Sequence, residues 1–363
     1  MLALFAEAYP RDDIVPNHLR DVSQDLGDFR GALAEAQEAL KLSPGQAIFY
    51  YNLASVYLNL DRLDEARASA MEAQNLGAPI AYGLLYQIDF LQHDAAGMDT
   101  NVTALMGKPG YEDIVLGQES DTAGYAGKFA RARELTRRAA ASAKRAGEQE
   151  AAAGYLAWAA LRDALVGNLG MARRQAQAGL AFSQGRDVEA ISAIALALAG
   201  DAGNASRLAG DLTKRFPADT FVQIEYLPTI QGGTALSSGK QARSAAKAIE
   251  ALAVVAQYKL GAFPLGYWGT PLCHIYLLGE GYLAAGQGTA AAAEFQKILD
   301  HPGVVMNFVT GALAHLGLGR AYALADDDVK ARTAYQDFLA LWRDADPDIP
   351  VLKQARAEYA KLR

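Results

Sequence analysis

The sequence predicts an all-α superhelix of stacked helix pairs that ends in a C-terminal capping helix. The first reason is a recurring motif in which a turn-forming Gly or Asp is followed five residues later by alanine, as in Gly27/Ala32 and Asp61/Ala66. The second is that further small or apolar residues follow each alanine by four and seven positions, which places all three on one helical face. A chain of 363 residues suits such an array, because each unit packs only on its neighbours and no single core has to keep growing.

The motif occurs seven times in register, which an alanine-rich composition alone does not explain. The first interval between anchor alanines is 34 residues, and the two longest, 66 and 86 residues, each accommodate two units. We therefore expect a degenerate unit inside each long interval. In the later one, Ala248, Leu252 and Val255 continue the pattern. The anchors are Ala32, Ala66, Ala132, Ala172, Ala205, Ala291 and Ala331.

The elements follow one another as a single solenoid over residues 1–363. The turn residue closes each pair, and Pro44, Pro79 and Pro217 stop the second helices that precede them. The acidic run at residues 326–328 is expected to cap a helix, and Pro350 to stand near the first position of the last one. The expected units are two well-formed pairs (13–80), a degenerate pair (81–112), three pairs (113–217), a degenerate pair with an aromatic loop (218–271), two well-formed pairs (272–343) and the capping helix (344–363).

One stretch of the chain resembles a known repeat, the tetratricopeptide repeat of 34 residues. The resemblance rests on the spacing of Tyr50, Leu53, Ala54, Tyr57, Ala66, Ala70, Ala73 and Pro79. It implies a right-handed solenoid whose concave wall is formed by the first helix of each pair. Such walls commonly hold extended peptides or helices.

The last hundred residues carry a second resemblance. Residues 281–302, 321–339 and 342–350 are similar to the C-terminal repeat region of bacterial eukaryotic-like serine/threonine kinases and related multidomain regulators. This implies a sensor or scaffold part of such a protein, or a free-standing relative. The chain lacks the glycine-rich loop and the Asp-Phe-Gly motif that phosphoryl transfer requires. We therefore expect it not to be an enzyme.

Polar residues on the first helices of the first two units are the expected contact set on the concave wall. A protein or peptide is the expected partner. The predicted groove residues are Asn17, His18, Asp21, Tyr51, Asn52, Ser55 and Asn59.

Two other surfaces are secondary candidates. One is a basic helix in an acidic chain, which either docks an acidic partner or simply forms a solvated outer face. The other is the loop at residues 263–271, whose aromatic side chains either mark an interaction site, pack back onto the solenoid or line a small-molecule pocket. The residues are Arg131, Arg133, Arg137, Arg138, Tyr267 and Trp268.

Composition limits the remaining function classes. The net charge of −7 disfavours nucleic-acid binding, which relies on cations at phosphates. Cys273 is the only cysteine, and the five histidines never pair at ligand spacing, so we expect no metal and no cofactor. No apolar run is long enough for a membrane span. The expected location is the cytoplasm, or outside it if the chain follows a membrane span in a longer protein.

Overall fold

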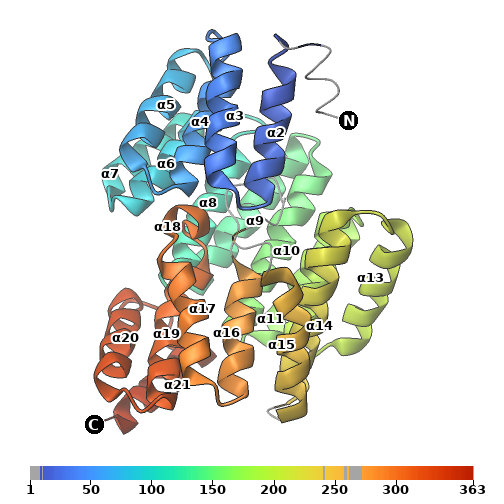
Figure 1. Ribbon diagram of the computed structural model, residues 1–363, viewed down its shortest axis with the longest axis vertical. Coiled ribbons are helices and arrows are strands. Elements are labelled where there is room, and N and C mark those ends of the chain that lie inside the picture. The colour runs from blue at the N-terminus through green and yellow to red at the C-terminus, as the bar shows by residue number, and fades with distance from the viewer. Residues whose placement is uncertain (1–8, 10, 240–241, 257–259, 261–271, 363) are drawn as a thin grey trace.

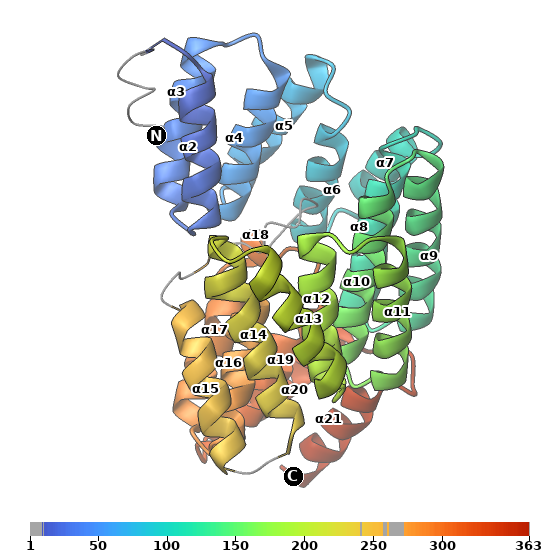
Figure 2. The same ribbon diagram turned by 90° about the vertical axis from the view of Figure 1, so that its right-hand side faces the viewer.

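The computed structural model describes residues 9, 11–239, 242–256, 260 and 272–362, and over these residues the fold is an all-α superhelix (Figure 1). Figure 2 shows the same helices turned by 90°, with the N-terminal helices at the top and the C-terminal helix at the bottom. The predicted fold class is confirmed. Tyr267 and Trp268 lie outside the described residues, so their candidate role stays a prediction.

Successive helices pair in chain order. The one irregular first helix begins with a π-helical turn, η1 (Val222–Tyr226), which continues directly into α14 (Leu227–Ser237). The other pairs are α2 (Ile14–Asp25) with α3 (Phe29–Leu42), α4 (Ala47–Asn59) with α5 (Leu63–Asn75), α6 (Ala81–Leu91) with α7 (Ala95–Leu105), α8 (Glu112–Tyr125) with α9 (Phe129–Arg145), α10 (Gln149–Leu165) with α11 (Leu169–Phe182), and α12 (Arg186–Leu198) with α13 (Ala202–Arg215). After α14 come α15 (Ala242–Ala256), α16 (Cys273–Ala284) with α17 (Gly288–Leu299), the short α18 (Pro302–Val305), α19 (Val309–Leu324) with α20 (Asp328–Leu341), and α21 (Pro350–Lys361).

The anchor alanines lie where neighbouring helices approach most closely. All seven have no exposed surface. The turn residue before each anchor takes a left-handed backbone conformation at positions such as Gly27, with φ of 72°, which glycine adopts without strain. Asp327 caps α20 by accepting a hydrogen bond from the Lys330 amide at 3.1 Å. The repeat pattern therefore marks the packing positions correctly.

A segment between α17 and α19 closes the superhelix on itself. We call residues 302–308 the clasp segment. The amide of Gly303 donates to Asp61 Oδ1 at 2.7 Å, and Asn59 Nδ2 donates to the Gly303 carbonyl at 3.2 Å. Asn307 Nδ2 donates to the Gln118 carbonyl at 2.8 Å, on α8. The clasp segment thus joins α4 to α8, which are far apart in sequence (Figure 1).

The C-terminal end also turns back onto the middle of the chain. Trp342 Nε1 donates to the Tyr125 carbonyl at 2.9 Å, and the Asp346 amide donates to the Gly127 carbonyl at 3.0 Å. Asp346 Oδ2 accepts from the Ala130 amide at the start of α9 at 2.7 Å. The helix α21 does pack on α20, yet the segment before it also binds the middle repeats, which the sequence pattern alone did not reveal.

Among the described residues, no helix has the length and apolar character that crossing a membrane demands.

Candidate functional site: the inner wall of the N-terminal unit

The predicted groove residues lie on two adjacent first helices, α2 and α4. Hydrogen bonds between side chains join the two helices along their length. Asn52 Nδ2 donates to Asn17 Oδ1 at 2.7 Å. Seven residues further along each helix, Gln24 Nε2 donates to Asn59 Oδ1 at 2.6 Å, and it also donates to Ser55 Oγ at 3.0 Å. The inner wall, meaning the seven predicted groove residues, is therefore a fixed polar surface and not a set of independent side chains.

Burial divides the inner wall into two groups. Asn52 and Asn59 are each only 7% exposed, and Asn59 is further occupied by the carbonyl of Gly303. The side chains of His18 and Asp21 are 56% and 47% exposed, with His18 Nδ1 3.6 Å from Asp21 Oδ2. The asparagines thus hold the wall together, whereas His18 and Asp21 are accessible to a partner. The prediction of Asn52 and Asn59 as contact residues stays untested, and their burial favours a positioning role.

Two further residues of α2 contact the inner wall and were not predicted from the sequence. Arg20 is buried, and its Nη1 donates to Gln24 Oε1 at 2.9 Å while its Nη2 lies 2.6 Å from Asp21 Oδ1. Burial lowers the pKa of the Arg20 guanidinium, and the neighbouring Asp21 partly offsets this. Gln24 follows Asn17 by seven residues and Asp21 by three, so helical spacing was the signal that could have found it.

Further along the solenoid the concave side is occupied by the chain itself. Besides the Asn307 bond to Gln118, Asn307 Nδ2 donates to Thr122 Oγ1 at 2.9 Å. The ring of Phe308 packs edge-on against Trp158 of α10, with centroids 5.5 Å apart. Partner binding along the wall of α8 and α10 would therefore require displacement of the clasp segment.

The basic helix α9 is largely neutralised by neighbouring carboxylates. Arg133 Nη1 lies 3.0 Å from Oδ1 of the buried Asp163, and Arg137 lies 2.8 Å from Glu134. Arg131 is 3.9 Å from Glu119. The remaining candidate is Arg138. Burial raises the pKa of Glu119, and the charges of Arg131 and Arg138 oppose that rise. The hydrogen bond from Arg137 lowers the pKa of Glu134, and the charge of Arg138 adds to this. These pairs make α9 a weak candidate for a free basic surface.

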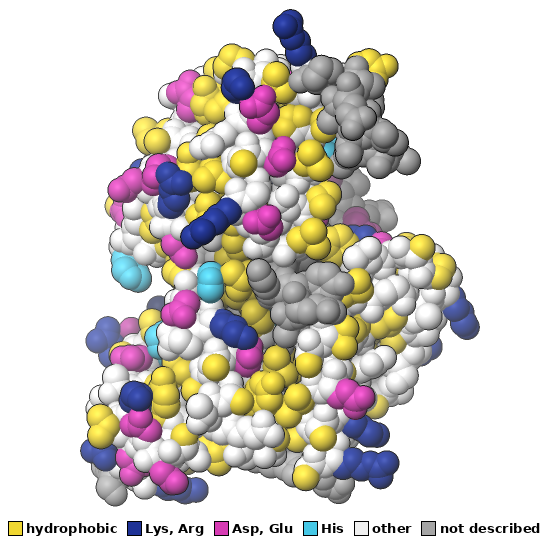
Figure 3. Space-filling model, viewed as in Figure 1, with side chains coloured by type: hydrophobic (Ala, Val, Ile, Leu, Met, Phe, Trp, Pro, Cys, Tyr) yellow, Lys and Arg dark blue, Asp and Glu magenta, His cyan; other side chains and the backbone are white. Residues whose placement is uncertain are grey.

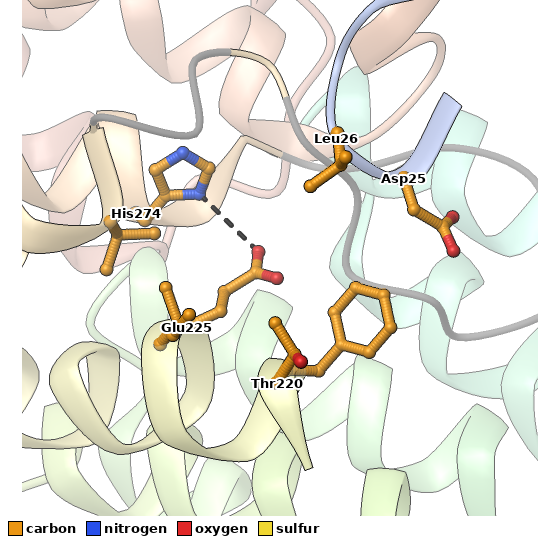
Figure 4. Close-up of a pocket in the computed structure, with 8 residues that line it drawn as sticks. Asp25, Leu26, Thr220, Glu225 and His274 are labelled. Atoms are coloured by element: carbon orange, nitrogen blue, oxygen red, sulfur yellow. Dashed lines mark ion pairs between the residues drawn. The ribbon is translucent and has the colours of Figure 1, made fainter. Parts of the chain in front are cut away.

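A small cavity lies where the end of α2 meets η1, α15 and α16 (Figure 4). Its volume is about 30 Å³, which has room for water but for little else. His274 Nδ1 lies 3.8 Å from Glu225 Oε1 inside it, and Asp25 stands across the cavity (Figure 4). Burial raises the pKa of Glu225 well above its ordinary value, and the charge of Asp25 adds to this.

Asp25 and Cys273 extend the same pattern of burial. Burial raises the pKa of Asp25 to about 6, with Asp21 adding to the rise and Arg20 opposing it. Burial also raises the pKa of the Cys273 thiol to about 12, which keeps it protonated and unreactive. The cavity therefore lies at a largely apolar junction between the end of α2 and the central helices, with Asp25, Glu225 and His274 as its titratable side chains. Within the described ranges, no three His, Cys, Asp or Glu side chains gather closely enough to hold a metal ion.

The comparison with known protein families matches the N-terminal unit. Residues 22–77 match the tetratricopeptide repeat family. This match covers the last four residues of α2 and all of α3, α4 and α5. Asn17, His18 and Asp21 lie before the matched residues. No curated protein matches the sequence.

Several solved structures align with the chain. The crystal structure of yeast Tom70 aligns with 99% of this chain and 92% of its own, at 11% identity and a TM-score of 0.39. The tetratricopeptide domain of P58(IPK) aligns with 97% of both chains, at 14% identity and a TM-score of 0.28. A Naa15/Naa10 complex bound to HypK-THB aligns with 99% of this chain and 62% of that one, at 14% identity and a TM-score of 0.28.

Proposed function

We propose that this chain is a non-catalytic scaffold that binds a protein or peptide through the inner wall of its N-terminal unit, α2 to α5. The observation that carries the proposal is the exposed pair His18 and Asp21 on a wall held rigid by the Asn17–Asn52 and Gln24–Asn59 hydrogen bonds. A rigid wall loses little conformational freedom on binding, which favours affinity. The match to the tetratricopeptide repeat over residues 22–77 supports the same unit.

The chemistry of the wall indicates the kind of segment that fits it. Ile14 and Ile48 are exposed and lie one turn before His18 and Asn52 on their helices, so they share the wall's face. Asp21 supplies a carboxylate acceptor beside them. We propose a partner segment that places apolar side chains on the isoleucines and a basic or amide group on Asp21. Ion pairs at such an exposed site contribute modestly to affinity, so the isoleucines matter as much.

The test uses paired surface variants. The double variant His18→Ala/Asp21→Ala removes an exposed pair three residues apart on the wall. Glu38→Ala/Lys41→Ala removes a comparable exposed pair, 3.1 Å apart, from the outer helix α3. Partners captured on immobilised wild-type chain are identified, and the Kd of each is then measured for all three proteins.

We expect the wall variant to weaken binding roughly tenfold and the outer variant to leave it within about twofold. Circular dichroism should show the same helicity for all three proteins. A partner that binds the wall variant as tightly as wild type would refute the proposed surface.

The proposed context remains regulatory or assembly work in a bacterial cytoplasm. We base this context only on the resemblance of residues 281–350 to kinase-associated repeat regions that the sequence suggests. In that context the partner includes the rest of a longer protein. Small-molecule binding on the inner side has less support. The cavity at Glu225 and His274 holds about 30 Å³, far below the ~300–1,000 Å³ of ordinary ligand pockets.

A further inference from the structure

A larger hollow lies in the second degenerate unit, between α13 and α15, with α14 as its floor. We call it the α13–α15 groove. Its volume is about 790 Å³ and it is open to solvent. The lining is mixed: Ala209, Ala235 and Ala251 come from the three helices, and Ile230 lies beside polar side chains such as Gln231. This volume lies within the range of functional binding pockets.

Loose packing of α13 explains why the groove is open. In most other units the second helix packs closely on the next first helix, but α13 packs loosely on α14. The π-helical turn η1 precedes α14 and interrupts the regular helical register. Each of the three helices contributes a small alanine to the lining, and most of the larger lining side chains are polar or charged. Figure 1 shows α13 at the edge of the molecule beside α14.

The charges on the groove are of one predominant sign. Arg243 and Lys247 lie one turn apart on α15 and line the groove, and both are exposed. Within the described part of the chain neither has a carboxylate at ion-pair distance, whereas most arginines of α9 do. Glu250 also lines the groove, which leaves one net positive charge among these three side chains. In a chain of net charge −7 this is a local reversal of sign.

We propose that the α13–α15 groove binds an acidic amphipathic helix of a partner protein. The partner's apolar face packs on Ala235, Ala251 and Val254, and its carboxylates pair with Arg243 and Lys247. Two helical walls whose lining includes exposed apolar side chains suit a helix laid lengthwise, as in other helix-in-groove complexes. The unpaired cations select acidic partners and speed their approach, in a molecule whose overall charge repels them. This surface is separate from the inner wall and does not depend on the function proposed above.

The probe is a phage-displayed library of helical peptides. One half of the library fixes Asp and Glu beside a variable apolar face, and the other half fixes Lys and Gln instead. Selection uses the full chain, and Kd values of the enriched peptides are measured by fluorescence anisotropy. We expect enrichment from the acidic half only. Binding should weaken severalfold between low and moderate salt, because exposed ion pairs are screened.

Two variants locate the binding. Arg243→Glu/Lys247→Glu should weaken the selected peptides at least about tenfold, since two attractions become repulsions. Arg207→Glu/Lys214→Glu makes the same charge change on exposed positions of α13 that do not line the groove, and should cost less than about twofold. Ala209→Trp keeps all charges and fills the groove, and should also abolish binding.

The results separate this proposal from the inner-wall proposal. His18→Ala/Asp21→Ala should bind the selected peptides as wild type does. No enrichment of acidic peptides overturns the groove proposal. Equal binding to wild type and to Arg243→Glu/Lys247→Glu, or to Ala209→Trp, also overturns it.

Discussion

Replacing Gly303 by alanine tests whether the clasp segment holds the N-terminal unit against the rest of the superhelix. A Cβ added at this position would overlap the carbonyl oxygen of Leu58, and would lie 2.9 Å from the carbonyl carbon of Leu58 and 2.8 Å from Asp61 Oδ1. The Leu58 atoms belong to the backbone of α4 and cannot rotate away. Alanine at position 303 therefore has to push the clasp segment off α4.

The cost follows from what that movement breaks. The Gly303 amide loses its bond to the Asp61 carboxylate, and the Gly303 carbonyl loses its bond from Asn59. A bond to a charged group contributes about 1.5–3 kcal/mol and a neutral one about 1 kcal/mol. Because the chain can relax and the groups regain water, we expect a total loss of about 2–4 kcal/mol.

The assay combines urea denaturation with hydrogen exchange. A repeat array unfolds in parts, so we expect Gly303→Ala to separate the transition of α2 to α5 from the rest. Amide exchange should quicken in α4 and in the clasp segment. Gly210→Ala on α13 is the control, because a Cβ there meets nothing within 4 Å, and it should be neutral or stabilise by up to about 1 kcal/mol. Unchanged exchange and stability in Gly303→Ala would refute the role of the clasp segment.

Two further predictions concern Asp25, which lines the small cavity, and Trp342, which binds the end of α8. In the folded chain Asp25 keeps its proton up to about pH 6, while in the unfolded chain it releases the proton near its ordinary value of 3.8. The free energy of unfolding should therefore fall as pH rises from about 4 to 6. Partial exposure reduces this loss to about 1–2 kcal/mol, and Asp25→Asn should abolish it; parallel pH profiles of the two proteins would contradict this. Trp342→Phe should leave the Tyr125 carbonyl without its indole donor and lower stability by about 1–3 kcal/mol in thermal denaturation, and an unchanged Tm would show that the bond is unimportant.

Much of the fold is encoded locally. The spacing of small residues placed the helix pairs because a helix brings positions three and four apart onto one face. Ala248, Leu252 and Val255 show this in the second degenerate unit, since all three are buried despite the irregular first helix before them. Pro350 begins α21, as its fixed φ favours.

The candidate site was only half predictable. Sequence spacing placed Asn17, His18, Asp21 and the α4 residues on one wall. It could not show that Asn59 is occupied by Gly303, a residue 244 positions later in the chain. Nor could it show that Arg133 is paired with Asp163, because the two lie on different helices.

The sequence by itself determined the helix pairs, their turns and their packing faces, since these depend on residues close together in the chain. The tertiary structure alone decided which parts of the concave side stay open. The clasp segment and Trp342 close the superhelix through contacts between residues hundreds of positions apart, and no local pattern encodes such contacts. The α13–α15 groove has the same origin, because it exists only through the loose packing of one helix on another.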